Sequence, residues 1–337
     1  MVSGKTENKM TTAKQKFSVA GEKMEGIDFI RLAKPMGGLS LLLVVISLAL
    51  ILTKGFNYGI DFTGGTEMQV KFGSAVSVEQ VRAVLTEVGA GSASVQTFGE
   101  ANEFLIRIGT PELADANAQN RELNALLEKV KTGLSSKLGM KAEELLRVDT
   151  VGPQVGSELK KNGLLAAFYS LLVLLIYISV RFDYAYAPGA IICLVHDSLI
   201  TLGVFAIMGR EVNVQIIASI LTLIGYSLND TIVTFDRIRE MAPLNRDKSL
   251  AFILNKGINE TLGRTILTAV STLMACLGLY FLSGGVIAEI AFTLIIGIIV
   301  GAYSTIYVAA PLIMLMDKLT PGSTAAIPHS SSATNPA

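Results

Sequence analysis

Residues 221–240 read LTLIGYSLNDTIVTFDRIRE, and this stretch sets the architecture expected of the whole chain. Its first part, with the residues that precede it from Val214, has the length and apolar character of a membrane-spanning helix. Asp230 lies inside this helix, where a carboxylate costs about 2.5–3.5 kcal/mol on insertion scales and needs a partner or a water-filled cavity. Intramembrane acids commonly mark ion or proton paths, which makes Asp230 the first candidate functional residue. The structural alternative is that Asp230 lies close enough to the helix end to reach interfacial water.

The polar residues around Asp230 extend this candidate site. Tyr226, Ser227 and Asn229 lie in the same stretch and are candidates for a relay or for packing. Arg264 lies at the start of the next apolar run, in the segment LGRTILTAV at 262–270. On position alone it could equally be an anchor whose side chain snorkels to the interface. Its place in the same leaflet as Asp230 favours a pair that lowers the cost of both charges.

A second polar pair, His196 and Asp197, lies in the preceding apolar run. Neighbouring residues of a helix point to different faces, so the sequence predicts that these two do not line one path. A packing role and a relay role both stay open for them. Glu289 lies near the end of the last apolar run, where interfacial solvation is enough to explain it.

The composition is that of an integral membrane protein. Hydrophobic residues make up 51% of the 337 residues and charged residues only 17%, and the mean hydropathy is +0.53. Both cysteines, Cys193 and Cys276, lie in apolar runs, so no disulfide framework is predicted. The sequence contains no HExxH, no GxSxG and no metal-ligand cluster. We therefore expect no enzyme activity, no cofactor, no metal site and no nucleic-acid partner.

The apolar runs predict six transmembrane helices. They cover residues 37–53, 164–180, 188–208, 212–235, 265–282 and 286–316. A cleaved signal peptide is the alternative for the first run, but its basic region would be unusually long and no cleavage pattern follows it. In the last run Thr293, Gly297, Gly301 and Thr305 recur every four residues, a spacing typical of a close helix–helix packing face. The polar tail at 1–36 is expected in the cytoplasm, and the tail at 319–337, rich in Ser, Pro and Ala, is expected to be disordered.

Between the first two helices the sequence predicts a soluble insert at 54–160. Strands are expected at 67–72, 93–98, 103–108 and 145–151, and helices at 78–88 and 111–138. The order βαββαβ is that of an α+β ferredoxin-like domain. Before the first strand, Gly64 and Gly65 supply backbone freedom for a turn.

The basic residues of the short loops predict the orientation. Lys and Arg gather in the tail 1–36, at Arg181, in the loop 237–256 and at Lys318, whereas the short loops on the other side hold only Arg210. The positive-inside rule then places the N-terminus in the cytoplasm and the insert outside, in the periplasm. Within the inner loop, residues 250–254 with Ile258 are expected to form a short helix on the membrane surface.

Five segments together carry a family resemblance. They are GIDFTGGT at 59–66, VGPQVGSEL at 151–159, LVHDSLITLG at 194–203, IGYSLNDTIVTFDRIRE at 224–240 and GRTILTA at 263–269. In this order they resemble the SecF family, the smaller members of the SecD–SecF protein-export pair within the resistance–nodulation–division superfamily. The resemblance covers about residues 30–318 and leaves out both polar tails.

The resemblance implies a function and a set of partners. It implies a multi-pass subunit of the bacterial inner membrane that works with a SecD-like subunit, the SecYEG translocon and YajC, and that uses the proton motive force to pull unfolded polypeptide across the lipid bilayer. The family's intramembrane acid and arginine correspond to Asp230 and Arg264. Two rivals stay open: one half of a small-molecule or lipid exporter of the same superfamily, and a structural subunit in which these two residues form a buried tie.

Overall fold

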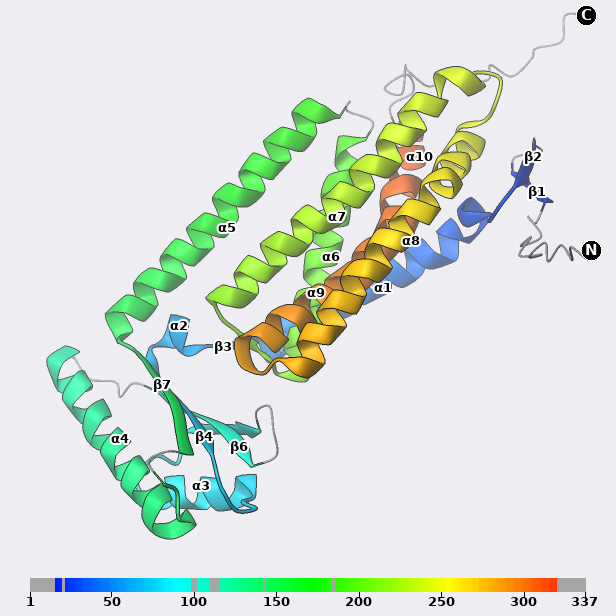
Figure 1. Ribbon diagram of the computed structural model, residues 1–337. Helices are drawn as coiled ribbons and strands as arrows, with labels where there is room; N and C mark the ends of the chain where they lie inside the picture. The colour runs from blue at the N-terminus through cyan, green and yellow to red at the C-terminus, as the bar shows by residue number, and fades with distance from the viewer. Residues whose placement is uncertain are drawn as a thin grey trace, which may run out of the picture.

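The computed structural model describes residues 16–19, 22–97, 102–109, 116–141, 144–182 and 186–319. Within these residues, six helices are long and apolar enough to cross a membrane, which confirms the six predicted spans. The predicted disorder of the C-terminal tail falls outside the described residues, and so do residues 1–15, 20 and 21 of the basic N-terminal tail. Figure 1 shows the long helices as one slanted bundle with a smaller sheet-containing domain at one end.

The bundle consists of helices that are longer than the apolar runs that predicted them. They are α1 (Phe29–Lys54), α5 (Pro153–Arg181), α6 (Ala187–Met208), α7 (Val214–Met241), α8 (Leu250–Leu282) and α9 (Gly285–Ser304). α9 continues through a π-helical turn (Thr305–Ala309) into α10 (Ala310–Leu319), so that the last span is one bent rod.

Capping residues explain why two of these helices begin before their apolar runs. The Asp28 carboxylate accepts from the backbone N–H of Arg31 at 3.0 Å, so α1 begins at Phe29. Ser249 caps α8 in the same way, by accepting from the N–H of Phe252. Residues 250–258 are helical as predicted, but the prediction of a separate surface helix is wrong, because no proline follows Ser249 before Leu282 and these residues form the first turns of α8. Ile258 is buried inside the bundle rather than lying on a membrane surface.

The chain that enters α1 is tied to α8 at the end of the bundle far from the small domain. Asn255 accepts from the N–H of Phe29 at 2.9 Å, and Asn259 both accepts from the N–H of Ile27 and donates to its carbonyl at 2.8 Å. A short antiparallel hairpin, β1 (Lys16–Val19) and β2 (Glu22–Glu25), precedes this tie.

The small domain has the element order βαββαβ. It contains β4 (Gly65–Lys71), α3 (Val78–Glu87), β5 (Ser94–Thr97), β6 (Glu103–Gly109), α4 (Ala116–Leu138) and β7 (Leu145–Val151). The four strands form one antiparallel sheet in the order β5-β6-β4-β7. Its core packs Met68, Val70 and Ile106 of the sheet against apolar side chains of α3 and α4, a two-layer arrangement. Strand β7 is left as an exposed edge of the sheet.

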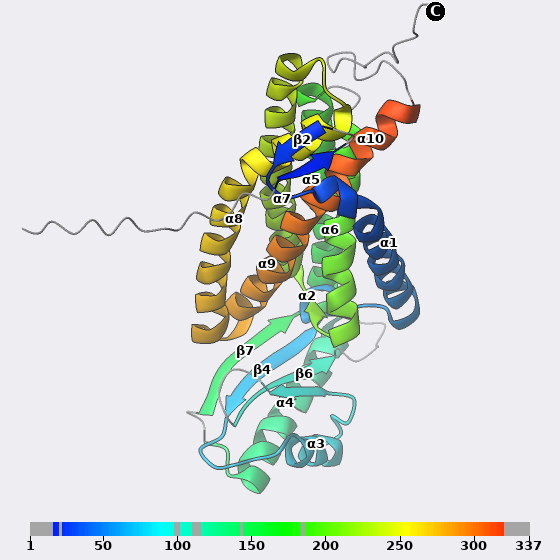
Figure 2. The same ribbon diagram turned by 90° about the vertical axis from the view of Figure 1, so that its right-hand side faces the viewer.

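A short connection joins the small domain to the bundle, as seen from the side in Figure 2. β3 (Asn57–Tyr58) pairs in parallel with β8 (Glu211–Val212), which lies between α6 and α7, and α2 (Ile60–Thr63) follows β3. Gly64 and Gly65 have φ values of 71° and 133°, where a side chain is strained. A Cβ on Gly65 would also lie 2.5 Å from the carbonyl oxygen of Ile108. The pair of glycines is therefore required where the chain turns into the sheet.

Candidate functional site

Asp230 is positioned by α7 to face α8. Its side chain is half-buried, and its Oδ1 accepts from the Thr265 hydroxyl at 2.6 Å. A hydroxyl bond of this length to a carboxylate is of the strong, charge-assisted kind. Thr265 is a site residue that the sequence reasoning missed. Its only signal in the sequence is its position beside Arg264.

The structure does not bring Asp230 and Arg264 into direct contact. Arg264 is exposed and forms no ion pair with Asp230 in the part of the chain that the structure describes. Its charge nevertheless acts on Asp230 through space. Thr265 and Arg264 are consecutive, so their side chains differ by about 100° around α8, and only one of them can face α7. Arg264 therefore stands at the outer surface of the bundle beside the acid.

The three other polar residues of the α7 stretch separate into different environments. Asn229 is exposed, whereas the hydroxyl of Tyr226 is buried and has no hydrogen-bond partner among the described residues. Ser227 is fully buried and donates to Asp197 Oδ2 of α6 at 2.5 Å. Only Ser227 therefore takes part in a polar cluster within the bundle.

His196 and Asp197 contact each other, although as neighbours on α6 they start toward different faces of the helix. His196 Nδ1 lies 2.9 Å from Asp197 Oδ1, and the two side chains are 4% and 0% exposed. The imidazole is long enough to reach back to the carboxylate of the next residue, although the two Cβ atoms diverge. His196 also stacks on Tyr303 of α9, with ring centroids 6.4 Å apart.

Further hydroxyl and thiol groups extend this polar core toward α9 and the π-helical turn. Thr231 lies 3.0 Å from the Thr305 hydroxyl, and the Cys193 thiol donates to Ser304 at 3.0 Å. The absence of a side chain at Gly301 lets α9 approach α7 closely here. A Cβ added to Gly301 would lie only 3.2 Å from Ser227 of α7. The four-residue spacing of small residues in α9 thus identified the face that packs against α7, but it did not identify the hydrogen bonds that this approach permits.

The junction with the small domain holds a second cluster of charged groups. Arg107 of β6 donates to Glu67 of β4 at 2.6 Å and also forms an ion pair with Glu211 of β8. Asp61 of α2 accepts from the backbone N–H of Val214, the first residue of α7, at 3.2 Å. These contacts connect the small domain to the same helix that carries Asp230. Asp61, Glu67 and Glu211 also line an open cavity of about 300 Å³ at this junction. No metal-holding group of His, Cys, Asp or Glu occurs among the described residues.

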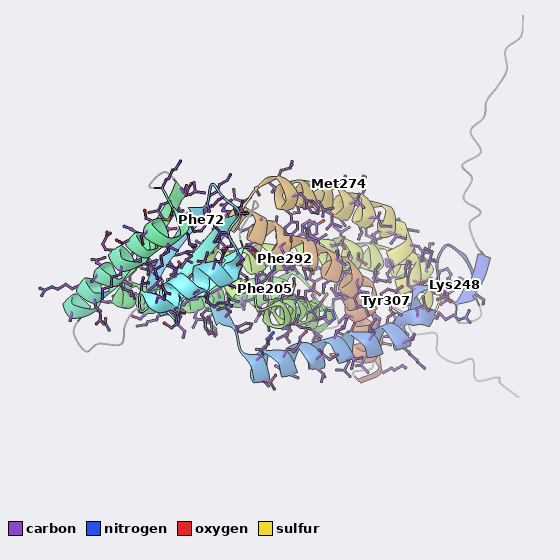
Figure 3. All side chains as sticks on the ribbon, turned by 90° about the horizontal axis from the view of Figure 1, so that it is seen from below. Phe72, Phe205, Lys248, Met274, Phe292 and Tyr307 are labelled. Carbon is purple, nitrogen blue, oxygen red and sulfur yellow. The ribbon has the colours of Figure 1, made fainter. Side chains whose placement is uncertain are left out.

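Glu289, expected to need only interfacial solvation, is instead paired. Its carboxylate accepts from Arg210 at 2.8 Å, and the guanidinium of Arg210 lies 3.8 Å from the centre of the Phe292 ring. Figure 3 shows Phe292 beside Phe205 in the bundle, whereas Tyr307 lies further along the same rod, away from the small domain. The pair closes the domain-side end of the bundle between α6 and α9.

Comparison with known proteins gives matches over most of the chain. Residues 131–319 match the family model described as protein export membrane protein SecD/SecF, C-terminal, and residues 49–76 match the SecD/SecF GG motif. The protein translocase subunit SecF of Desulfurispirillum indicum is 44% identical over 291 residues, which are 86% of this chain and 91% of that protein. The SecF subunit of Calditerrivibrio nitroreducens is 43% identical, over 87% of this chain and 95% of its own.

Solved structures show the same fold. The crystal structure of SecDF, a translocon-associated membrane protein from Thermus thermophilus, superposes with a TM-score of 0.76 at 36% identity. The superposition covers 87% of this chain and 39% of the SecDF chain. A second SecDF structure, in the super-membrane-facing form, gives a TM-score of 0.62 at 34% identity over 91% of this chain and 42% of its own. The chain therefore spans less than half the length of these SecDF proteins.

Proposed function

The chain belongs to the SecD/SecF family of protein-export membrane proteins, and we propose that it uses the proton motive force to drive late steps of protein translocation across the bacterial inner membrane. It is a multi-pass subunit of the Sec protein-translocation machinery and works with SecD. The proton coupling, the orientation and the further partners are parts of the proposal.

The proposal of proton coupling rests on one observation, the half-buried carboxylate of Asp230 inside a membrane-spanning helix. Its only direct hydrogen-bond partner in the described chain is a neutral hydroxyl, that of Thr265, and the cation Arg264 acts on it from the exposed surface. A carboxylate held in this way can bind a proton without breaking a direct ion pair. We propose that alternating protonation of Asp230, with Arg264 as its charge partner, changes the packing of α7 against α8. A charge that crosses the membrane potential supplies about 2.3 kcal/mol per 100 mV, enough to bias a two-state motion.

α7 is suited to carry that change to the small domain. Asp230 lies about 24 Å along the helix from Val214 at 1.5 Å per residue. Val214 is bound by Asp61, and the preceding Glu211 is bound by Arg107 of the domain. The proposed route therefore runs along one continuous helix, without a loop between the acid and the junction.

We place the domain at 54–160 in the periplasm, with the membrane part at 37–53 and 161–318 and the N-terminus in the cytoplasm. The distribution of Lys and Arg in the short loops supports this orientation. The element order βαββαβ and the strand order β5-β6-β4-β7 support a ferredoxin-like assignment for the domain. On the outer side the domain would meet unfolded polypeptide leaving the SecYEG channel, with YajC as a further partner.

Two exposed features support a SecD-like partner. Arg264 and Asn229 are both exposed beside Asp230, and polar groups at membrane depth need cover from another protein. The edge strand β7 exposes Leu146 and Val148, and an uncovered edge strand is a site where another strand adds. A single partner that covers the exposed Arg264 and Asn229 and also pairs with β7 would explain why no other part of this chain covers them.

The test is export by Asp230→Asn, which is close to isosteric and cannot carry a proton. Folding should survive, because the substitution removes a charge from the membrane. We expect the variant to assemble with its SecD partner at wild-type levels while gradient-dependent export of a secreted reporter falls to that of a deletion strain. Membrane levels and co-purification of the partner serve as controls.

The same experiment separates coupling from a structural tie. Export by Asp230→Asn at wild-type levels, with unchanged dependence on the proton gradient, would show that Asp230 is structural and would end the coupling proposal. Loss of the partner from the purified variant would instead identify Asp230 as part of the assembly surface.

A further inference from the structure

An open cavity of about 370 Å³ lies on the side of the bundle, toward the end far from the small domain. It is lined by the first half of α1, by α6 and by the segment from the π-helical turn into α10. Its wall is almost wholly apolar, and the Ser40 hydroxyl in it is used within the chain. Ser40 donates to the Tyr303 hydroxyl at 3.0 Å, and Tyr303 donates to the carbonyl of Met36 at 2.7 Å. The cavity therefore suits an apolar occupant that needs no hydrogen bonds.

The cavity is about as deep as one leaflet of a bilayer. On α1 its lining runs from Ala33 to Val44, which is about 16 Å at the helical rise. The hydrocarbon core is about 30 Å thick, so one leaflet supplies about 15 Å of it. Gly37 lines the cavity without filling it, since nothing lies within 4 Å of its Cβ position. Beyond the π-helical turn α10 runs away from α1, as Figure 2 shows. An acyl chain of one leaflet therefore matches the cavity in depth.

Two lysines continue the lined faces of the helices beyond the apolar wall. Lys34 lies one turn before Gly37 on α1, and Lys318 lies one turn after Leu315 on α10. Residues at this spacing share a face of a helix. Both lysines are exposed, and neither forms an ion pair among the described residues. A lysine stem can lie along apolar surface while its ammonium group reaches the interface, so both charges can stand where a head group would lie.

The charge at this end of the bundle favours an anionic head group. The basic side chains are Arg31, Lys34 and Lys318, and the carboxylates beside them are Asp28 and Asp317, of which Asp28 is engaged as the cap of α1. Under the proposed orientation this end is cytoplasmic, and basic pockets between helices on that side bind acidic lipid head groups. An apolar helix of a partner protein could also cover the wall, but it would bring no anion to the two lysines.

We propose that this cavity binds one anionic phospholipid, with an acyl chain against α1, α6 and α10 and its head group between Lys34 and Lys318. No covalent bond forms or breaks. The acyl chain fills space that the chain itself leaves empty between α1 and α10, and it thereby stabilises α1 on the bundle. The site does not depend on proton coupling at Asp230.

Photolabelling of the assembled protein tests the site. The full chain with its SecD partner is reconstituted in vesicles of phosphatidylethanolamine and phosphatidylglycerol that contain a trace of phosphatidylglycerol with a diazirine on its acyl chain. We expect labelled peptides from the parts of α1, α6 and α10 that line the cavity. Phosphatidylcholine with the same diazirine chain should label them about 25-fold less, about fivefold for each lysine. Equal labelling by the two probes would overturn the proposal of an anionic lipid.

Two adjacent glycines supply a matched pair of variants. Gly37 lines the cavity and Gly38 does not, and nothing lies within 4 Å of the Cβ position of either. Gly37→Leu should fill the cavity and reduce labelling of the lining peptides about tenfold, whereas Gly38→Leu should leave the labelling unchanged. Both variants replace glycine by a better helix former, so both should assemble with SecD normally. Equal labelling in the two variants would show that no lipid occupies the cavity.

The charges have a control of their own. We expect Lys34→Gln and Lys318→Gln each to lower the preference for the phosphatidylglycerol probe about fivefold. Lys161→Gln should leave the preference unchanged, because Lys161 is exposed on α5 near the small domain and lies away from the cavity. A preference that is unchanged in both cavity variants would contradict the placement of the head group.

The rival occupant is a helix of the partner protein. A photoreactive residue in place of Leu41, which lines the cavity and is 66% exposed, distinguishes the two. We expect it to capture phospholipid in the assembled complex. Capture of SecD in place of lipid would show that the partner covers the cavity and would overturn the proposal, whatever the outcome of the tests at Asp230.

Discussion

Asp230 accepts its hydrogen bond from Thr265, whereas Arg264, one residue earlier on α8, stands exposed at the surface of the bundle. The hydroxyl sets where the carboxylate lies, and the guanidinium acts on its charge. Sequence reasoning found the acid and the arginine because both are expensive in a membrane. It could not find the threonine, because a hydroxyl residue in an apolar helix is common and the sequence does not show which face of α8 meets α7.

Thr265→Val tests the role of this hydroxyl at Asp230. The substitution keeps the shape and both neighbouring charges but removes a hydrogen bond to a charged group, worth about 1.5–3 kcal/mol. We expect gradient-dependent export to fall about tenfold, less than in Asp230→Asn, with normal assembly. Thr268→Val is the matched control, because Thr268 is exposed on the same helix and bonds only to carbonyls of its own helix. Equal export by both variants would contradict the role given to Thr265.

Arg264 permits a second test that changes a single residue. Since the structure shows no bidentate pair between its guanidinium and Asp230, a point charge should replace it well. We expect Arg264→Lys to retain most of the gradient-dependent export and Arg264→Met to lose it, measured on the same reporter. If Lys and Met are equally poor, the planar guanidinium binds a specific partner group.

The close approach of α7 and α9 can be tested at the scale of the element. A Cβ on Gly297 would lie within 2.6 Å of three atoms of Leu223, and a Cβ on Gly301 would press on Ser227. Adding bulk to a packed interface costs about 1–3 kcal/mol, so we expect Gly301→Val to lower the melting temperature of the detergent-solubilised protein. Gly278→Val of α8 is the control, because nothing lies within 4 Å of its added Cβ. A shift of the same size in both would contradict the interface.

The two ion pairs of Arg107 allow the junction between the small domain and the bundle to be tested, because one pair crosses the junction and the other serves as the control. Arg107 binds Glu67 inside the domain and Glu211 at the bundle. We expect Glu211→Gln to broaden the distance distribution between spin labels on the domain and on the bundle, because it weakens the contact that crosses the junction. Glu67→Gln removes the contact of the same arginine within the domain and should leave the distribution narrow. Broadening in neither variant would show that β3–β8 pairing alone fixes the domain.

Most helices and strands could be predicted from the sequence. The errors in their boundaries and contacts have different physical causes. The strand at 145–151 matches β7 residue for residue, because its alternation and its flanking turn signals agree. The helix predicted at 250–254 was not recognised as the start of α8, because hydropathy marks only the membrane part of a helix and Ser249, its cap, lies outside that part. The contact of His196 with Asp197 was missed because helix periodicity places Cβ atoms and does not determine how far a long ring reaches back.

At the scale of the whole molecule, the proposed orientation can be tested by labelling. In a background without Cys193 and Cys276, single cysteines replace Ser135 of α4 and Asp247 of the loop before α8, both exposed. A membrane-impermeant thiol reagent added to cells with a permeabilised outer membrane should label position 135 at once and position 247 only after the inner membrane is opened. The reverse pattern would mean that the topology is inverted.

The tie between α1 and α8 joins residues that are far apart in the order of synthesis. Ile27 and Phe29 are bound by asparagines 226–232 residues later in the chain. At about 5–20 residues per second, the ribosome needs about 10–45 s to reach those asparagines after α1 has left it. Throughout this interval the start of α1 lacks its native partner. α1 therefore stays in the membrane without these contacts until α8, the fifth span, has been synthesised. Only then can this end of the bundle reach its native packing.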